Sequence, residues 1–209
     1  MECPWFFFLI KFKKGLWALN KFAWRCTVEI RDLNPVLDYK EVHRVYKAAF
    51  AGFPWHEDLS NEEVDRRLSS QFAMPGLSGF VLIEDDAIVG VHWHSILSLD
   101  SLVSERGPAL VDWVTENVSG QPLIIWEREL IVHPDYQRRG NSHWLRAAFL
   151  SQLHQASTDQ IVLTRLRDDN IGSIKSAERI GMIDTGVTKP ASEEGRTHHY
   201  WALRVTPED

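Results

Sequence analysis

The residues whose types and spacing could do chemistry lie at the end of one apolar segment, Leu123–Val132. That segment runs into a His-Pro-Asp-Tyr turn, and the stretch QRRGNS at residues 137–142 then leads into a helical pattern. The first N–H groups of a helix lack partners, and the helix dipole favours negative charge beside them. Gly140 lets the backbone approach a ligand closely, and Arg138 and Arg139 add positive charge. The combination predicts a pyrophosphate site, whereas the alternative is an ordinary basic turn before a helix.

Two carboxylates, Glu127 and Glu129, alternate along the same apolar segment. Residues two apart on a regular strand point to the same face of a sheet. A carboxylate at a ligand site can act as a general base, and either side chain is a candidate for that role. The competing interpretation is that they pair with neighbours such as Arg128 or cap a loop, since ion pairs also occur at strand ends.

Two histidines and one loop offer further polar groups. His92 and His94 alternate along a predicted strand and therefore share a face. A zinc site needs a third ligand, which is missing at clear spacing, so we predict no metal site and interpret both as substrate-pocket or structural histidines. Trp55 and Glu57 lie in a loop with Gly and Pro, where they could hold a cation between a ring face and a carboxylate. The alternative is that the aromatic residues of this loop only anchor it on the core.

The elements that must position these residues follow from the apolar patterns and the turn residues. Ser60 and Glu63 predict a capping box, Asp85-Asp86 a hairpin turn and Gly181 a helix end. Strands are expected at 27–33, 80–84, 88–96, 123–132, 161–166, 182–188 and 198–205, and helices at 38–50, 60–72, 108–117, 141–155 and 170–180. This order predicts one α/β domain with a mixed central sheet and helices on its faces.

Two of these segments resemble the signatures of the GNAT superfamily of acetyl-CoA-dependent N-acetyltransferases. The turn is similar to the family's pyrophosphate motif, Q/R-x-x-G-x-G/A: Gln137, Arg139 and Gly140 fit, and Ser142 stands where Gly or Ala is usual. Asn170–Met182 resembles the second signature, in which Asn opens a helix and Gly-Phe closes it. The element order matches too, so the resemblance covers nearly all of a domain at 27–209, beyond an N-terminal aromatic and basic extension at 1–26.

The resemblance implies a GNAT fold and transfer of an acetyl group from acetyl-CoA to a primary amine of a small molecule or peptide, by direct attack in a ternary complex. It implies that strands 123–132 and 161–166 splay apart around the pantetheine arm. Glu129 is the preferred base or amine anchor and Glu127 the second choice, while Trp55, Glu57, His92 and His94 are assigned to the acceptor pocket. The implied cofactor-binding residues are Leu130, Ile131, Val132, Gln137, Arg138, Arg139, Gly140, Asn141, Ser142, Asn170 and Ser173.

The chain departs from the family at Ala177, where typical members carry the Tyr that protonates the departing thiolate. Met182 also replaces the usual Phe. The resemblance would place residue 177 against the thioester sulfur, so the identity of the general acid stays open. A catalytically weak, regulatory acetyl-CoA-binding domain is therefore the alternative function.

Composition narrows the function classes. A formal net charge of −6 argues against a uniform basic surface for nucleic acid. Two cysteines imply neither a disulfide framework nor a four-cysteine metal site, and we expect a reduced, cytoplasmic setting. Residues 1–25 carry five basic residues against one acidic residue, and their apolar run is too short to span a bilayer. This segment is interpreted as a loose extension, or as one that docks on a membrane or a partner; a homodimer stays open.

Overall fold

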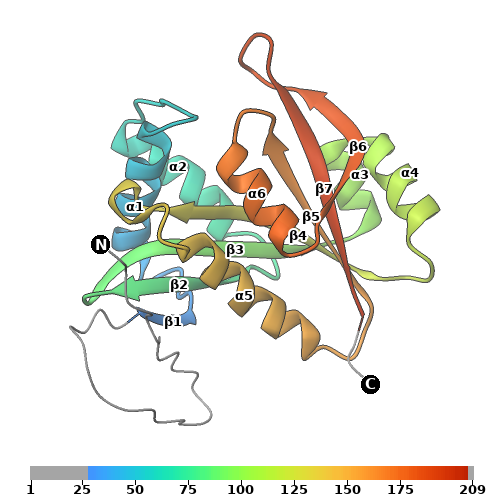
Figure 1. Ribbon diagram of the computed structural model, residues 1–209, viewed down its shortest axis with the longest axis horizontal. Coiled ribbons are helices and arrows are strands. Elements are labelled where there is room, and N and C mark those ends of the chain that lie inside the picture. Colours follow the sequence, from blue (N-terminus) through green and yellow to red (C-terminus); the bar gives the residue numbers. More distant parts are fainter. Residues whose placement is uncertain (1–27, 207–209) are drawn as a thin grey trace, which may run out of the picture.

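The chain folds around one seven-stranded sheet, which Figure 1 shows in a computed structural model that describes residues 28–206. The predicted extension at 1–26 lies outside the described residues. The strands lie in the order β1-β2-β3-β4-β5-β7-β6, and β4 and β5 form the one parallel pair of this sheet. The strands are β1 Val28–Asp32, β2 Ser78–Glu84, β3 Ala87–Leu97, β4 Leu123–Val132, β5 Gln160–Arg167, β6 Ile183–Pro190 and β7 Thr197–Val205. The predicted mixed α/β sheet is confirmed.

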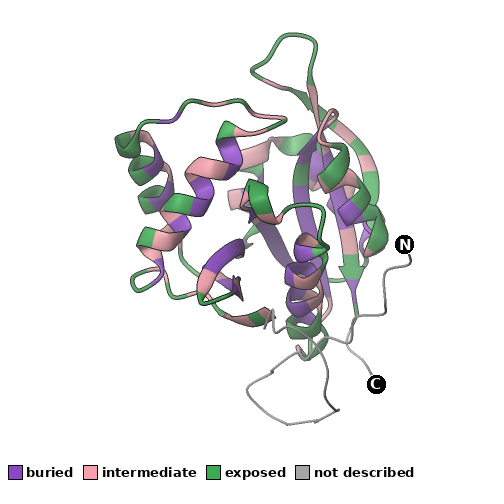
Figure 2. Cartoon of the chain, turned by 60° about the vertical axis from the view of Figure 1, so that its left-hand side comes forward, coloured by how far each residue is buried: buried purple, intermediate pink, exposed green. Residues whose placement is uncertain are grey.

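Helices cover both faces of the sheet (Figure 1). One face packs against α5 and α6 through a core that includes Leu145 and Phe149. The opposite face carries two separate cores, one under α1 and α2 with Trp93 at its centre, and one under α3 and α4 with Trp126. Figure 2 shows the buried residues on the strands and on the inward sides of the helices. The helices are α1 Tyr39–Ala51, α2 Asn61–Phe72, α3 Leu99–Arg106, α4 Pro108–Asn117, α5 Asn141–His154 and α6 Ile171–Arg179, with a 3-10 turn at Pro134–Tyr136.

Strands β4 and β5 separate halfway along β4. Their parallel pairing runs from Leu123 opposite Gln160 to Trp126 opposite Leu163 and then stops. Beyond that point β5 continues to pair with β7, while β4 stays paired with β3. The second half of β4 therefore has a backbone edge that no strand occupies, as the resemblance implied.

A β-bulge in β4 changes which way its carboxylates point. Trp93 pairs with Glu129 and His94 with Glu127, so Arg128 is one extra residue in the ladder. An extra residue breaks the alternation of side chains. Glu127 consequently faces α5 and Glu129 faces α2, as their hydrogen bonds show. The prediction that the two carboxylates share a face is wrong.

The predicted elements are all present, with ends that move by a few residues. Asp85 and Asp86 both have positive φ, 51° and 63°, which is the geometry of a tight hairpin turn. The sequence analysis missed α3, an eight-residue helix whose side chains show little apolar periodicity. Within residues 28–206, no helix is both long and apolar enough to cross a membrane.

The predicted capping box is only half formed. Ser60 Oγ accepts the N–H of Glu63 at 3.2 Å, so the helix start is correct. The Glu63 carboxylate instead takes hydrogen bonds from Arg66 and Arg67. Two guanidinium groups one turn away compete with a single backbone N–H, and charge-assisted hydrogen bonds are the stronger ones.

Candidate functional site

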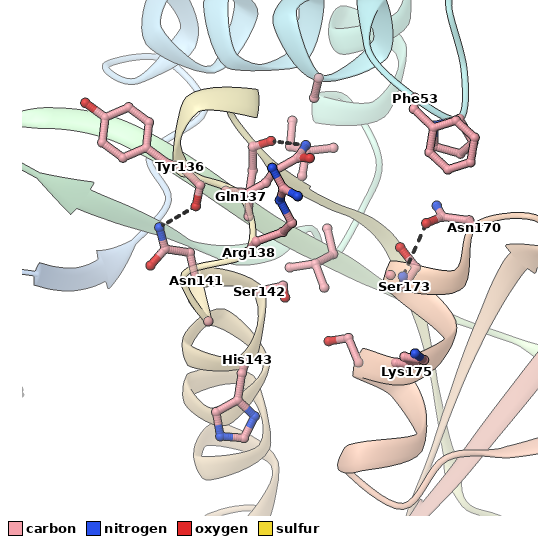
Figure 3. A pocket seen from close by; sticks show the side chains of 18 of the residues that line it. Phe53, Tyr136, Gln137, Arg138, Asn141, Ser142, His143, Asn170, Ser173 and Lys175 are labelled. Carbon is pink, nitrogen blue, oxygen red and sulfur yellow. Dashed lines mark hydrogen bonds between the residues drawn. The ribbon is translucent and has the colours of Figure 1, made fainter. Parts of the chain in front are cut away.

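A cavity of about 400 Å³ lies along the open edge of β4 (Figure 3). Its walls come from the α1–α2 loop, the turn before α5 and the first turns of α6. Of the predicted site residues, it is lined by Trp55, Leu130, Ile131, Val132, Gln137, Arg138, Gly140, Asn141, Ser142, Asn170 and Ser173. The cavity therefore brings together the end of β4, the turn before α5 and the start of α6, as the two motifs predicted.

The turn before α5 presents a row of free backbone donors. Among the described residues, the N–H groups of positions 138–142 have no hydrogen-bond acceptor. Arg138 and Gly140 are both left-handed, with φ of 60° and 87°. A Cβ on Gly140 would meet only Trp144 Nε1, at 4.0 Å, so glycine is required here for its conformation and not for space. Consecutive N–H groups at a helix start form a concave site for an anion.

Two amide side chains hold this turn closed. Gln137 Nε2 donates to the carbonyl of Val132 at 3.0 Å, and Asn141 Nδ2 donates to the carbonyl of Tyr136 at 3.0 Å (Figure 3). Both residues line the cavity, yet these amide groups serve the turn itself. The two amide groups therefore contribute to anion binding by fixing the backbone of the turn that carries the free N–H groups.

Arg139 does not take part in the cavity. Its guanidinium donates to the carbonyl of Asp135 at 2.7 Å and to Glu84 at 3.3 Å, and it lies over the Tyr136 ring at 4.9 Å. The left-handed backbone at Arg138 sends the two consecutive arginines in different directions. Arg138 lines the cavity, whereas the Arg139 side chain binds Glu84 of β2, so the prediction that this guanidinium binds the cofactor is wrong.

Helix α6 offers hydroxyl groups to the cavity. Asn170 Oδ1 caps the helix by accepting the N–H of Ser173 at 3.2 Å, and both residues line the cavity. Ser176, one turn further on, is 8% exposed, and its Oγ has no partner among the described residues. The sequence analysis missed Ser176, although its spacing of three from Ser173 places both on one helix side.

Ala177 faces the other way. It is fully buried in the core beneath α6, with Ile174 packed against the same core. Ile174 and Ala177 are three apart and share the inward side, while Ser173 and Ser176 share the cavity side. Ala177 does not line the cavity, so the sequence-based placement of residue 177 against the thioester is wrong.

Glu129 is a half-buried carboxylate on the face covered by α1 and α2. Gln71 Nε2 donates to it at 3.3 Å, and the carbonyl oxygen of Gln71 accepts the Trp93 indole N–H at 2.8 Å. Burial raises the pKa of Glu129 to about 7, against the opposing charges of Arg165 and Arg67. A carboxyl group with that pKa can exchange a proton near neutral pH.

Glu127 has the opposite environment. It is buried and takes hydrogen bonds from Arg146 Nε and Nη2 at 3.0 and 2.9 Å, and it lies 3.1 Å from His92 Nε2. Burial opposes its ionisation, but Arg146 and His92 hold the pKa of Glu127 well below its usual range. Arg146 also donates to the carbonyl of Ser173 at 3.4 Å, so it joins β4, α5 and α6. Glu127 is part of this structural link and does not line the cavity, so its catalytic role stays a prediction.

His92 and His94 are buried behind the cavity. Their rings lie 4.5 and 4.6 Å from the Phe149 ring of α5, and neither lines the cavity. Burial, together with the neighbouring His92, lowers the pKa of His94 to about 3, so it stays neutral. The assignment of both histidines to the acceptor pocket is wrong. No group of three or more metal-binding side chains occurs within residues 28–206.

Trp55 and Glu57 have separate partners. Trp55 lines the cavity and stacks on Phe50, and the Arg167 guanidinium lies over its ring at 4.5 Å. Glu57 forms an ion pair with Arg67 at 2.7 Å and does not line the cavity. The predicted cation site between Trp55 and Glu57 is therefore wrong, because a guanidinium of the protein already occupies the ring face.

Solved structures share this architecture. No family model matches the sequence, and a search of curated proteins finds no match. The ribosomal-protein-S18-alanine N-acetyltransferase from Escherichia coli is 16% identical over 88% of this chain and 97% of its own, with a TM-score of 0.62. Arabidopsis thaliana NAA60 in complex with a bisubstrate analogue is 12% identical over 87% of this chain and 100% of its own, with a TM-score of 0.63.

A third similar structure is a GNAT-superfamily phosphinothricin acetyltransferase from Sinorhizobium meliloti in complex with acetyl-CoA. It is 13% identical over 86% of this chain and 89% of its own, with a TM-score of 0.60. All three matches span most of both chains. The chain therefore has the fold of the GNAT acetyltransferases.

Proposed function

We propose that this protein is an acetyl-CoA-dependent N-acetyltransferase that acetylates a primary amine. The observation that carries the proposal is the cavity at the open edge of β4, which ends at five backbone N–H groups that have no acceptor within residues 28–206. The similar structures from Sinorhizobium meliloti and Arabidopsis thaliana were solved with acetyl-CoA, which supports the same donor here. Two cysteines and an acetyl-CoA donor are consistent with a cytoplasmic protein, which we include in the proposal.

Different parts of the cavity would bind the pyrophosphate and the pantetheine arm of acetyl-CoA. The N–H row of 138–142 and the Arg138 side chain would hold the pyrophosphate. The open edge of β4 at Leu130–Val132 offers backbone groups to the amides of the pantetheine arm, as an added strand would find them. The Ser176 hydroxyl, buried and without a partner, gives the cavity wall a further hydrogen-bond donor.

The proposed reaction uses Glu129 as its base; this residue precedes the lining residue Leu130 on β4 and does not itself line the cavity. Bound acetyl-CoA supplies an activated acetyl group. Glu129 takes a proton from the acceptor ammonium, directly or through water, so that the nitrogen lone pair is free to attack. The new C–N bond forms as the C–S bond breaks, and the sulfur keeps the bonding electron pair. The nitrogen then gives up its second proton, which the thiolate takes. The products are the N-acetyl amine and coenzyme A.

A regulatory acetyl-CoA-binding domain is the second candidate. Ala177 has no hydroxyl group and is buried in the core, so the usual acid of the family is missing. A thiol is already acidic, with a pKa of about 8.5, and its thiolate leaves with less help than an alkoxide needs. This property favours a working enzyme over a domain that only binds.

The test uses Gly140. Gly140→Val should weaken coenzyme A binding at least about tenfold, because a β-branched residue is disfavoured at φ 87° and the N–H row must shift. Gly140→Asn should bind more tightly than the valine variant, because Asn tolerates the left-handed conformation. Gly120→Val, at φ 83° in the loop before β4, matches the strain away from the cavity and should bind as wild type does.

The readouts are isothermal titration with coenzyme A and thiol release from acetyl-CoA over a panel of amines. Unchanged binding by Gly140→Val would remove the turn from the site. Tight binding of acetyl-CoA without thiol release from any amine would favour the regulatory domain.

A further inference from the structure

A second polar cluster lies on the opposite face of the sheet from the helices α5 and α6. Three buried polar atoms there have no partner among the described residues: Arg106 Nε, His198 Nδ1 and the Tyr200 hydroxyl. A buried donor without an acceptor costs free energy, and such groups call for an explanation such as a ligand. None of the three lines the acetyl-CoA cavity.

The cluster surrounds the bulge of β4. Tyr200 of β7 lies directly opposite Arg165 of β5, and side chains of directly opposite residues share a face. The Tyr200 ring meets Trp126 of β4 at 6.1 Å, and the Arg106 guanidinium lies over that indole at 4.2 Å. Trp126 precedes Glu129 by three residues, and Arg165 acts electrostatically on Glu129. The cluster therefore lies next to the proposed base.

Guanidinium groups outnumber carboxylates around Arg106, whereas His198 also lies near Glu193 and Asp168. Arg106 and Arg128 share one carboxylate, Glu105, at 3.3 and 2.7 Å. Arg165 is exposed, and its side chain makes no hydrogen bond or ion pair within residues 28–206. Burial, together with the like charge of Arg165, lowers the pKa of Arg106 to about 10. Guanidinium groups that repel one another beside unused donors are suited to an anion.

We propose that this cluster binds a carboxylate of the acceptor, so that the substrate is a small amine that also carries a carboxyl group. The inference rests on the proposed acetyltransferase function. Arg165 is the solvent-facing contact, and Arg106 and Tyr200 supply the buried donors. The amino group of the same molecule then lies toward Glu129, on the edge of β4 that faces the donor cavity. A carboxylate is preferred over a bulky neutral acceptor because the donors converge from β5, β7 and α3.

The experiment compares each common amino acid with its carboxamide. The two differ in charge at one position and keep the amine. Binding to the full chain loaded with coenzyme A is measured by titration calorimetry, and thiol release from acetyl-CoA is measured separately. At least one amino acid should bind and react about 10- to 100-fold better than its amide, the usual effect of a charge-assisted hydrogen bond.

Two variants test whether Arg165 and Tyr200 contact the carboxylate of the substrate. Arg165→Gln should reduce that preference about tenfold or more through KM, with little change in the KM for acetyl-CoA. Tyr200→Phe keeps the buried ring and removes only the hydroxyl group, so it should reduce the preference without unfolding the chain. Arg204→Gln is the matched control, because Arg204 is an exposed arginine of the same sheet whose partner is Asp159 at 2.7 Å.

The outcomes separate the two proposals. If amides bind and react as well as acids, or if Arg165→Gln keeps the full preference for the acid, the carboxylate site is wrong and the acetyltransferase proposal stands. If phosphorylated amines are preferred over carboxylates, the anion site stands but its substrate class is wrong. If coenzyme A itself does not bind, the proposed function fails, whatever the amino acids do.

Discussion

Glu127 and Glu129 are the same residue type two positions apart, yet their carboxyl groups behave in opposite ways. Glu127 is ionised in a buried pair with Arg146, whereas burial raises the pKa of Glu129 to about 7. Environment, not residue type, assigns the roles of such carboxylates. The sequence named both candidates but wrongly placed them on one face, because one inserted residue in a strand leaves no trace in an apolar pattern.

Glu129 gives the activity a predicted pH dependence. A base must be deprotonated to work, so kcat/KM should rise as the pH increases through about 7 and then level. Glu129→Gln keeps the shape and removes the titrating group, so its rate should fall about 10²- to 10⁴-fold and lose that inflection. The measurement is kcat/KM from pH 5.5 to 9. Glu116→Gln, on the exposed side of α4, is the control; an unaltered profile for Glu129→Gln would assign the proton to another group.

The Glu129 carboxyl group also makes the free energy of unfolding depend on pH. The ordinary pKa is 4.5 and the folded value is about 7, so between these pH values the folded chain holds a proton that the unfolded chain has lost. The free energy of unfolding should therefore decrease as the pH rises across this window. Glu129→Gln should show a smaller decrease than wild type in urea unfolding at pH 5 and pH 8.

The three elements around the cavity, β4, α5 and α6, are joined by one buried arginine. Arg146 leaves α5, holds Glu127 of β4 with two hydrogen bonds and reaches the carbonyl of Ser173 on α6. The motifs predicted α5 and α6 well, since each begins with a distinct polar signature. The link between them was not predictable, because an arginine in a helical pattern is usually solvated and only the packed fold shows that this one is buried.

Glu127→Gln should destabilise the chain by about 3 kcal/mol. The change leaves Arg146 with no counter-ion in the core, and breaking a buried ion pair on one side is costly. Urea unfolding at pH 7 measures the loss, and Glu116→Gln again serves as the exposed control, with an expected change within about 0.5 kcal/mol. A variant as stable as wild type would show that the Glu127–Arg146 ion pair does not stabilise the contact between β4, α5 and α6.

Ala177→Tyr should lower stability and not raise turnover. Ala177 is fully buried on the inward side of α6, so a tyrosine ring would overpack the core at a cost of about 1–3 kcal/mol. Glu178→Tyr adds the same ring at the next, exposed position and should be nearly neutral. Thermal unfolding and thiol release are measured for both variants. A faster and fully stable Ala177→Tyr enzyme would instead place residue 177 beside the thioester.

For the molecule as a whole, the sequence predicts the order of the helices and strands. It does not predict which side chains of distant elements contact one another. Apolar alternation and helix caps gave the strands and helices, because those signals are local. The burial of His92 and His94 against Phe149 and the outward turn of Arg139 depend on contacts between distant segments. The sequence therefore predicted the residues that line the cavity better than the surroundings of the carboxylates and histidines, since a turn before a helix needs only a short motif.

The predicted domain boundary leads to a test on the whole chain. The edge strand β1 begins at Val28 and pairs with β2 from Val28 opposite Glu84 to Asp32 opposite Phe80. All seven strands and the cavity lie within residues 28–206, so a chain that begins at Thr27 keeps every contact described for them. We expect this shorter chain to bind coenzyme A within about twofold of the full chain.

Thermal unfolding with and without coenzyme A measures this, because a ligand that binds only the folded state raises the Tm by an amount that grows with the logarithm of its concentration divided by its Kd. The ligand-induced shift, and not the Tm itself, is the quantity to compare, since the two chains can differ in stability for reasons unrelated to the site. A chain that begins at Asn34 lacks β1 and exposes the edge of β2, so it should lose the cooperative transition. If the chain from Thr27 unfolds cooperatively but shows no shift with coenzyme A, residues 1–26 belong to the binding site and the domain boundary is wrong.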